Sequence, residues 1–229
     1  MINKWLHLDE LGGDPWVLPI WAAIHEAIEA GKIKKPADEV YDYGVYISIR
    51  LNILPRIVKR LNKNAALLYE EIKMHGEEHI FIEGLEGCAY PVENDLKYEL
   101  LAEIDALIFE INATWELIKK LFSSLYGHIG IPIEPKKFGS TVADVLNQND
   151  WFKSLDAHRN FFMHEGAPYL AVDLSVEPDH FDLLILKKNI ISFSNPDDFV
   201  ALSDVNAIVH GFVVSKLQLQ THLITLFRG

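Results

Sequence analysis

The chain has 229 residues, 49% of them hydrophobic and 24% charged, which is the composition of a globular protein of one domain or of one domain with a small appendage. Its single cysteine, Cys88, excludes an intramolecular disulfide, and no apolar run reaches the roughly 18 residues of a membrane span. The formal net charge of −12 at pH 7 disfavours binding of polyanions by the chain as a whole, so a nucleic-acid site requires a local basic surface.

The N-terminal part of the chain predicts a helix. Residues 1–10 contain Asp9 and Glu10 and lack the pattern of a secretory signal peptide, so we expect a cytoplasmic protein. Asp14 and Pro15 are a suitable helix start, because aspartate caps helices well and proline is tolerated at the first helical position. Apolar residues follow at helical spacing as far as Gly31. We therefore expect a helical extension over residues 1–40.

A second helical stretch is predicted from Tyr41 to Glu71. Pro55 lies inside it and is expected to kink or divide the helix, because proline lacks the backbone donor. The expected core positions of this stretch are Ile49, Ile53, Ile57, Leu61 and Leu68. Residues 43–69 include no acidic residue, and their candidate RNA-binding side chains are Arg56, Lys59, Arg60 and Lys63. The alternative interpretation of these four residues is a solvated helix face.

The strongest helical pattern runs from Asn94 to Tyr126, after a loop at Gly76–Pro91. We expect this helix to be the longest and to form the centre of the fold, because one apolar stripe continues along its whole length. The stripe consists of Leu100, Ile104, Leu107, Ile111, Trp115, Ile118, Phe122 and Leu125.

Two helices and a small β region are predicted in the next part of the chain. Thr141–Leu146 should form a short helix, and a longer one should run from Asp150 to His164, where Gly166 and Pro168 follow as a typical helix end. β-Strands are expected at Tyr169–Leu174 and Phe181–Leu186, which a segment at Ile190–Phe193 would extend.

A last helix is predicted from Ser203 to Phe227, which completes the expected architecture. The fold class is mainly α: a helical bundle with a small β-hairpin or meander before its last helix. We expect the bundle domain to span residues 41–229.

The residues best suited to chemistry are Arg159, Asn160 and His164. Asn160 and His164 are four residues apart and share a helix face, which the long Arg159 side chain can also reach. They offer a permanently charged donor fork for phosphate, an amide for orientation and a titratable imidazole in the last helical turn. These groups suit metal-independent RNA cleavage, by proton transfer at the imidazole and charge stabilisation at the guanidinium. The structural alternative is an arginine and a histidine that tie the helix end to neighbouring carbonyl groups.

This Arg-Asn-x-x-x-His pattern resembles the signature of the HEPN (higher eukaryotes and prokaryotes nucleotide-binding) domains, and the likeness covers about Asn94 to Phe227. It implies a helical bundle that dimerises and places two copies of the motif across one cleft. Many members cleave RNA without a metal, and others are binding or scaffold modules. A polar residue of the long helix often supports the motif, and Asn112 or Glu110 is expected in that position here.

The sequence therefore predicts a homodimeric endoribonuclease of HEPN type that uses no metal and no cofactor and acts as a toxin or defence component. His164 would do the acid–base work, Arg159 would hold phosphate and Asn160 would orient the substrate. We expect Arg159 and His164 to lie in a partly exposed groove near a two-fold dimer interface. The alternatives are a non-catalytic HEPN-like module that binds a partner protein or a nucleotide, and a helical protein unrelated to HEPN domains.

Overall fold

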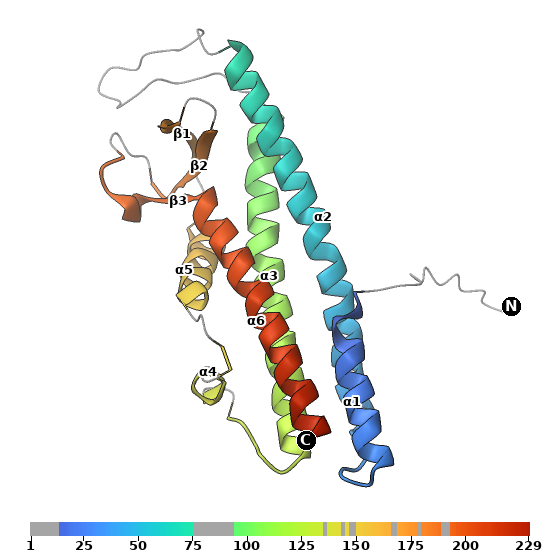
Figure 1. Ribbon diagram of the computed structural model, residues 1–229. Helices are drawn as coiled ribbons and strands as arrows, with labels where there is room; N and C mark the ends of the chain where they lie inside the picture. The colour runs from blue at the N-terminus through green and yellow to red at the C-terminus, as the bar shows by residue number, and fades with distance from the viewer. Residues whose placement is uncertain are drawn as a thin grey trace, which may run out of the picture.

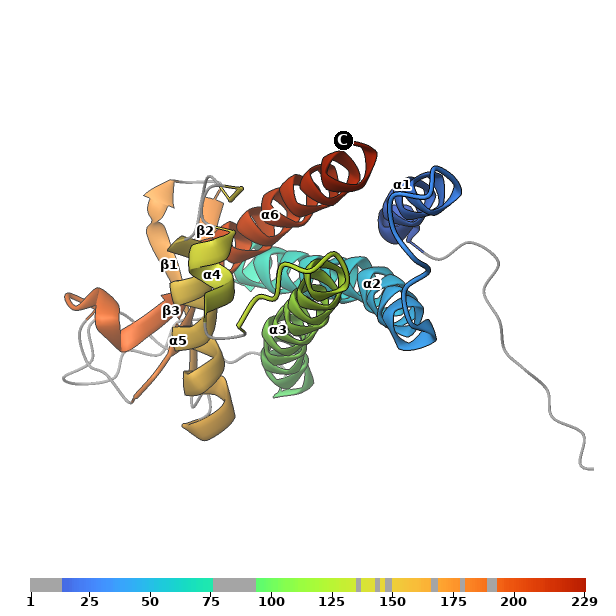
Figure 2. The ribbon, with the colours of Figure 1, turned by 90° about the horizontal axis from the view of Figure 1, so that it is seen from below.

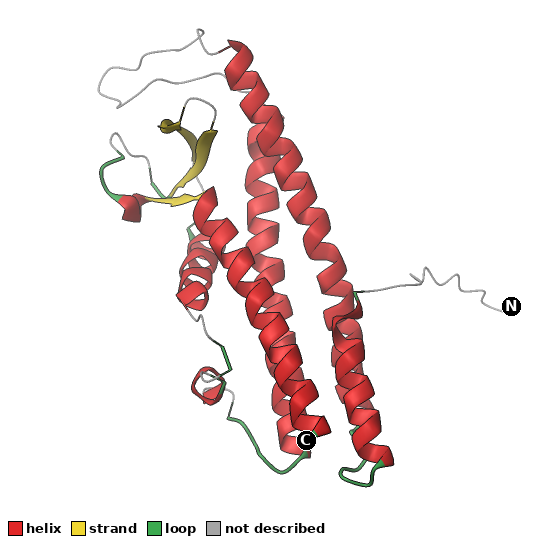
Figure 3. Ribbon diagram, viewed as in Figure 1, coloured by secondary structure: helices red, strands yellow, loops and turns green. Residues whose placement is uncertain are grey.

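The computed structural model describes residues 14–75, 94–134, 137–142, 145–146, 150–165, 169–177, 180–188 and 193–229. Helices dominate them (Figure 3), and the longest are α2 (Asp38–His75), α3 (Asn94–His128) and α6 (Leu202–Arg228). The other elements are η1 (Pro15–Val17), α1 (Leu18–Glu29), α4 (Phe138–Thr141), α5 (Asp150–His164), β1 (Tyr169–Glu177), β2 (His180–Leu186), η3 (Pro196–Asp198) and β3 (Phe199–Ala201). The prediction of a mainly helical bundle with a small β region before the last helix is confirmed.

The long helices form an elongated bundle with smaller elements on either side. α2 and α3 lie side by side, α6 contacts α3, and α1 packs on α6 (Figure 1). α5 contacts both α3 and α6 on the side away from α1, as the view from below also shows (Figure 2). β1, β2 and β3 form an antiparallel sheet in that order, and β2 packs against α6. The surface between α3 and α5 therefore lies on the bundle, and the sheet follows at the C-terminal end of α5.

The N-terminal helix begins as its sequence predicts. The Asp14 side chain accepts a hydrogen bond of 2.9 Å from the backbone N–H of Trp16, and Gly31 adopts φ +71° directly after α1. Ile20 and Ile24 of α1 are fully buried in the same hydrophobic cluster as the stripe of α3. Residues 1–13 lie outside the described part of the chain, and the division at residue 40 stays a prediction.

α2 is one continuous helix, so the expected division at Pro55 is wrong. Pro55 is exposed, and its ring is accommodated on the solvent side of the helix. The expected core positions Ile49 and Ile53 are also exposed, which is a second correction. Because the helix is continuous, its buried residues keep the helical spacing on both sides of Pro55. The buried residues before Pro55 are Ile47, Leu51 and Leu54, and those after it are the correctly predicted Ile57, Leu61 and Leu68.

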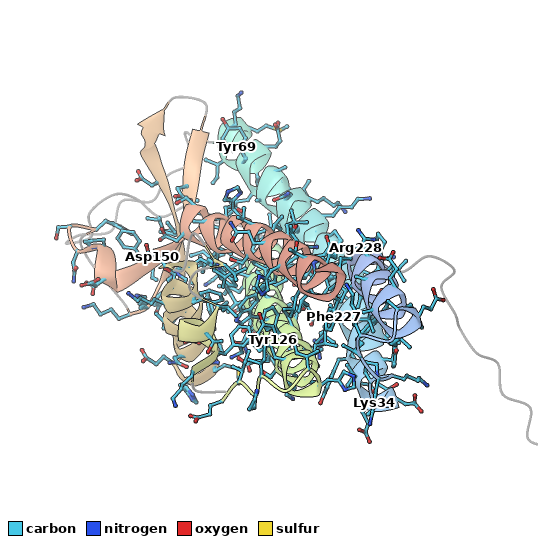
Figure 4. All side chains as sticks on the ribbon, turned by 60° about the horizontal axis from the view of Figure 1, so that its bottom comes forward. Lys34, Tyr69, Tyr126, Asp150, Phe227 and Arg228 are labelled. Carbon is cyan, nitrogen blue, oxygen red and sulfur yellow. The ribbon has the colours of Figure 1, made fainter. Side chains whose placement is uncertain are left out.

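α3 has the predicted bounds at its start and the predicted buried stripe. All eight stripe residues from Leu100 to Leu125 are buried, and side chains fill the space around Tyr126 between α3 and α6 (Figure 4). However, α3 has 35 residues and α2 has 38, so the expectation that α3 is the longest helix is wrong. Nor does any helix in the described residues combine the length and the apolar character needed to cross a membrane.

The segments after α3 follow the prediction in outline. The short helix α4 ends at Thr141 instead of beginning there, and β3 at Phe199–Ala201 is a strand beyond the predicted β region. Both differences arise where short apolar runs carry no clear period. The predicted loop at Gly76–Pro91 with Cys88, the helix-ending Gly166 and Pro168, and residues 189–192 lie outside the described residues.

One tryptophan holds α5 on the bundle. Trp151 is buried, its indole N–H donates to Ser215 Oγ of α6 at 2.9 Å, and its ring stands edge-on to Trp115 of α3 at 5.3 Å. Gly211 of α6 faces the same ring so closely that an added Cβ would lie 2.4 Å from it. α5 is thus locked against α3 and α6 by close packing, which fixes the position of its outer face.

Candidate functional site

α3 and α5 enclose a cleft of about 310 Å³. It is lined by Phe109 and Asn112 of α3 and by Arg159, Asn160, Met163 and His164 of α5. α5 presents these residues because Trp151, Leu155 and Phe161 face the core, which leaves its opposite face outward. The structure thus brings the three predicted site residues together in one partly open cleft.

Arg159 is held in this cleft by polar side chains on two helices. Its Nη1 donates to Asn112 Oδ1 at 3.3 Å, and its Nη2 donates to Asn160 Oδ1 at 3.1 Å. The nearest carboxylate oxygen, on the exposed Asp156, lies 3.6 Å from Nη1. The guanidinium is therefore oriented by two neutral amides and by an ion pair with an exposed carboxylate, which water screens.

The structure distinguishes the two expected supports on α3. Asn112 contacts Arg159, whereas Glu110 points to α2 and accepts a hydrogen bond of 2.8 Å from Arg50. Two residues along a helix correspond to about 200° of rotation, so Glu110 and Asn112 serve opposite neighbours. Asn112 is the residue of α3 that supports Arg159.

Asn160 and His164 form the open rim of the cleft. Both side chains are exposed, and His164 is the last residue of α5. Arg159 and His164 line the same cleft, so an anion bound there can contact both groups. That combination can bind a phosphate and move a proton at one of its oxygens.

The predicted RNA-binding residues Arg56, Lys59, Arg60 and Lys63 lie on α2, and none of them lines the cleft. Arg60 already binds Glu103 of α3 through two hydrogen bonds of 2.5 and 3.0 Å. Arg56 donates to the backbone carbonyl of Asn52 at 2.5 Å. Lys59 and Lys63 are exposed on the same helix. Any contact of these residues with RNA would be made outside the cleft.

Sequence patterns did not identify Phe109 and Met163 as parts of the cleft. Both are large apolar side chains that are exposed rather than buried. A signal was present for Phe109, because it lies outside the apolar stripe of α3 and on the same helix face as Asn112. Met163 was overlooked because it lies inside the motif itself, between Asn160 and His164.

A second histidine of α5, His158, faces the other way. Burial lowers its pKa, the positive charge of Lys187 lowers it further, and Asp204 at the start of α6 opposes the shift. Its Nδ1 atom is buried and has no hydrogen-bond partner among the described residues. His158 therefore belongs to the interface of α5 with the sheet and α6, and takes no part in the cleft.

No protein-family model, no curated protein and no solved structure matches this chain. The resemblance to HEPN domains rests on Arg159, Asn160 and His164 and on their helical setting, and it stays a prediction. Function is inferred below from the groups that line the cleft.

Proposed function

We propose that this protein is a metal-independent endoribonuclease of HEPN type and that the cleft between α3 and α5 is its active site. The observation that carries the proposal is the position of Arg159: Asn112 and Asn160 hold its guanidinium in the same cleft as the exposed His164. A charged donor fork in the same cleft as a titratable imidazole supplies two of the groups that cleavage of an RNA phosphodiester uses.

In the proposed reaction the ribose 2′-oxygen attacks the adjacent phosphorus as its proton passes to an imidazole. The bond from phosphorus to the 5′-oxygen breaks, and that oxygen takes a proton. The products are a 2′,3′-cyclic phosphate and a 5′-hydroxyl, so atoms and charge balance without a metal. Arg159 binds the non-bridging oxygens, whose negative charge grows in the transition state, and Asn160 orients the phosphate.

The proposed enzyme is a homodimer because the reaction uses a base and an acid at once. Among the residues that the structure describes, one histidine, His164, lines the cleft. A second copy of the chain, set across the cleft, would supply the second imidazole and a second Arg159. The lone cysteine is in keeping with the proposed cytoplasmic location, and an RNA-cleaving dimer would suit a toxin or defence component.

Incubation of the purified protein with mixed RNA, with and without a metal chelator, tests this function. Wild type should cleave in both conditions, and His164→Ala should lose about 100-fold or more in rate. His210→Ala is the matched control, since His210 is an exposed histidine of α6 that does not line the cleft. Arg159→Lys should restore little activity because lysine lacks the planar fork. Cleavage that stops with the chelator, or that survives His164→Ala, would contradict the proposal.

The second candidate is a non-catalytic HEPN-like module that binds a partner protein or a nucleotide. It is favoured by the contacts of Arg159 with Asn112, Asn160 and Asp156, since an arginine with three internal acceptors can serve as a brace. In that case His164→Ala should unfold the protein or separate its subunits, and wild type should cleave no RNA. Circular dichroism and size-exclusion chromatography of His164→Ala and of its control His210→Ala distinguish the two candidate functions.

A further inference from the structure

A strip of exposed aromatic side chains continues from the cleft along α3. Tyr98 and Phe109 are 62% and 50% exposed. They share one face of the helix with Asn112, because spacings of eleven and fourteen residues are close to whole numbers of turns. The helical rise of about 1.5 Å per residue places Tyr98 about 21 Å from Asn112 along α3. The strip is thus long enough to contact several nucleotides of an extended strand.

The start of β1 completes this strip at the end distant from Asn112. Tyr169 follows the end of α5 and is 45% exposed. Lys97 Nζ lies 5.5 Å from the centre of the Tyr169 ring and 5.7 Å from the centre of the Tyr98 ring. One ammonium group therefore lies near the rings of two tyrosines from different elements, within the distance of a cation–aromatic interaction. At the other end of the strip, Phe109 and Met163 line the cleft together with His164 and Arg159.

We propose that the aromatic strip formed by Lys97, Tyr98, Phe109, Met163 and Tyr169 binds single-stranded RNA and leads it into the cleft. This inference rests on the proposed function and names the substrate class of the same site. Aromatic rings beside cationic groups are the common means by which proteins hold single strands, since every base has a face that can stack. A duplex keeps its bases stacked on one another, so it cannot use such a surface.

The position of Asp105 gives the proposal a diagnostic. Asp105 is exposed on α3 between Tyr98 and Phe109, on the same helix face. A phosphate backbone that follows the strip must pass this carboxylate and is repelled by it. Removing the charge should strengthen binding of RNA most at low salt, because the repulsion between a carboxylate and a phosphate is screened by salt.

The experiment measures binding of a labelled oligouridylate to the full chain carrying His164→Ala, which prevents cleavage. Fluorescence anisotropy should show at least about tenfold tighter binding of the single strand than of a duplex of equal length. Tyr98→Ala and Tyr169→Ala should each weaken single-strand binding about tenfold, and Tyr98→Phe should keep it. Asp105→Asn should tighten it. The matched control is Tyr46→Ala, which removes an exposed tyrosine of α2 and should leave affinity unchanged.

The proposal for the aromatic strip is overturned if duplex and single-stranded RNA bind equally well, or if Tyr98→Ala and Tyr169→Ala bind RNA as Tyr46→Ala does. It is also overturned if these two variants change self-association and leave RNA binding intact, because the strip would then be a protein contact. If wild type cleaves RNA and neither tyrosine variant affects RNA binding, the aromatic strip is not an RNA site but the proposed ribonuclease function stands. If RNA binding depends on the two tyrosines but wild type cleaves no RNA, the strip binds RNA and the ribonuclease function is wrong. The two proposals therefore fail separately.

Discussion

Two arginines reach α3 from opposite sides, and their side chains are equally accessible. The Arg50 side chain is 32% exposed and that of Arg159 is 34% exposed. Arg50 donates to the carboxylate of Glu110 at 2.8 Å in the interface of α2 and α3. Arg159 donates to the neutral amide of Asn112 at 3.3 Å in the cleft of α3 and α5. The two arginines hardly differ in exposure, but the carboxylate at Arg50 is close and nearly buried, whereas the one at Arg159, on Asp156, is 3.6 Å away and exposed.

This difference separates an arginine that stabilises the fold from one that can bind a ligand. The Glu110 side chain is nearly buried, so it needs the charge of Arg50 as compensation. Asn112 requires no such compensation, and the carboxylate nearest Arg159 belongs to the exposed Asp156, where water screens the attraction. A phosphate can therefore be attracted to the charge of Arg159. To bind Arg50, a phosphate would first have to displace Glu110.

The largest expected effect is on stability. Arg50→Ala leaves the Glu110 carboxylate buried without a counter-charge and should lower the free energy of unfolding by about 3 kcal/mol. Arg159→Ala should cost less than about 1 kcal/mol, because its partners remain hydrated. Urea denaturation of both variants measures the difference, and Arg50→Ala/Glu110→Ala should recover part of the loss. Equal losses for Arg50→Ala and Arg159→Ala would show that the partner's charge does not distinguish the two sites.

A steric change behind the cleft comes next in size. Gly211→Ala places a methyl group 2.4 Å from the Trp151 ring, so α5 must shift, at a cost of about 2 kcal/mol. The shift should also weaken RNA cleavage or binding, because α5 carries Arg159 and His164. Gly127→Ala is the matched control: a Cβ there meets nothing within 4 Å, and the helix should gain about 0.5 kcal/mol. Thermal unfolding with an activity assay checks both, and a neutral Gly211→Ala would mean that Trp151 does not fix α5.

Much of the fold was predictable because apolar residues repeat over many turns. The stripe of α3 from Leu100 to Leu125 is buried as predicted, and α5 and α6 lie within a residue or two of their expected bounds. Two errors arose in α2. The helix was expected to kink or divide at Pro55, but an exposed proline costs one hydrogen bond and leaves the helix continuous. Ile49 and Ile53 were assigned to the core from a spacing of four residues, which rotates by about 40° at each step away from the buried Ile57 and Leu61.

The site was predictable only in part. Arg159, Asn160 and His164 lie on one helix, so their shared cleft follows from spacing. The choice between Glu110 and Asn112 depended on which helix packs on which side of α3, and local sequence does not carry that information. For the same reason Lys97 and Tyr169, far apart in the chain, could not be paired in advance.

The buried face of α5 should make the stability of the fold depend on pH. Burial and the charge of Lys187 lower the pKa of His158 from its ordinary value of 6.5, so the folded state binds this proton more weakly than the unfolded state. The contribution of neutral His158 to the free energy of unfolding is complete above about pH 6.5 and is lost as the pH falls toward the lowered pKa. His158→Gln should flatten this decline, and Lys187→Gln should flatten it partly. Urea midpoints across this pH range measure the effect, and an unchanged decline in both variants would remove His158 as its cause.

The smallest expected effect concerns the basic side chains of α2. The sequence predicts that changing Arg56 and Arg60 to Glu weakens RNA binding and flattens its salt dependence. The comparison of Arg50 with Arg159 gives a rule that makes this test more specific. An arginine that is bound closely to a carboxylate attracts a phosphate only weakly.

Arg60 is bound to Glu103 through two hydrogen bonds, so Arg60→Gln should leave the salt dependence of RNA binding nearly unchanged. Lys59→Gln and Lys63→Gln remove exposed charges, and each should lower the slope of log affinity against log salt by about 0.7 if it contacts a phosphate of a single strand. Salt titrations of oligouridylate binding, in the His164→Ala background, compare the three variants directly. If Arg60→Gln lowers the slope as much as the lysine variants, RNA displaces Glu103 and the rule fails for α2. If none of the three changes the slope, α2 lies outside the RNA path, and binding depends on Arg159 and the aromatic strip alone.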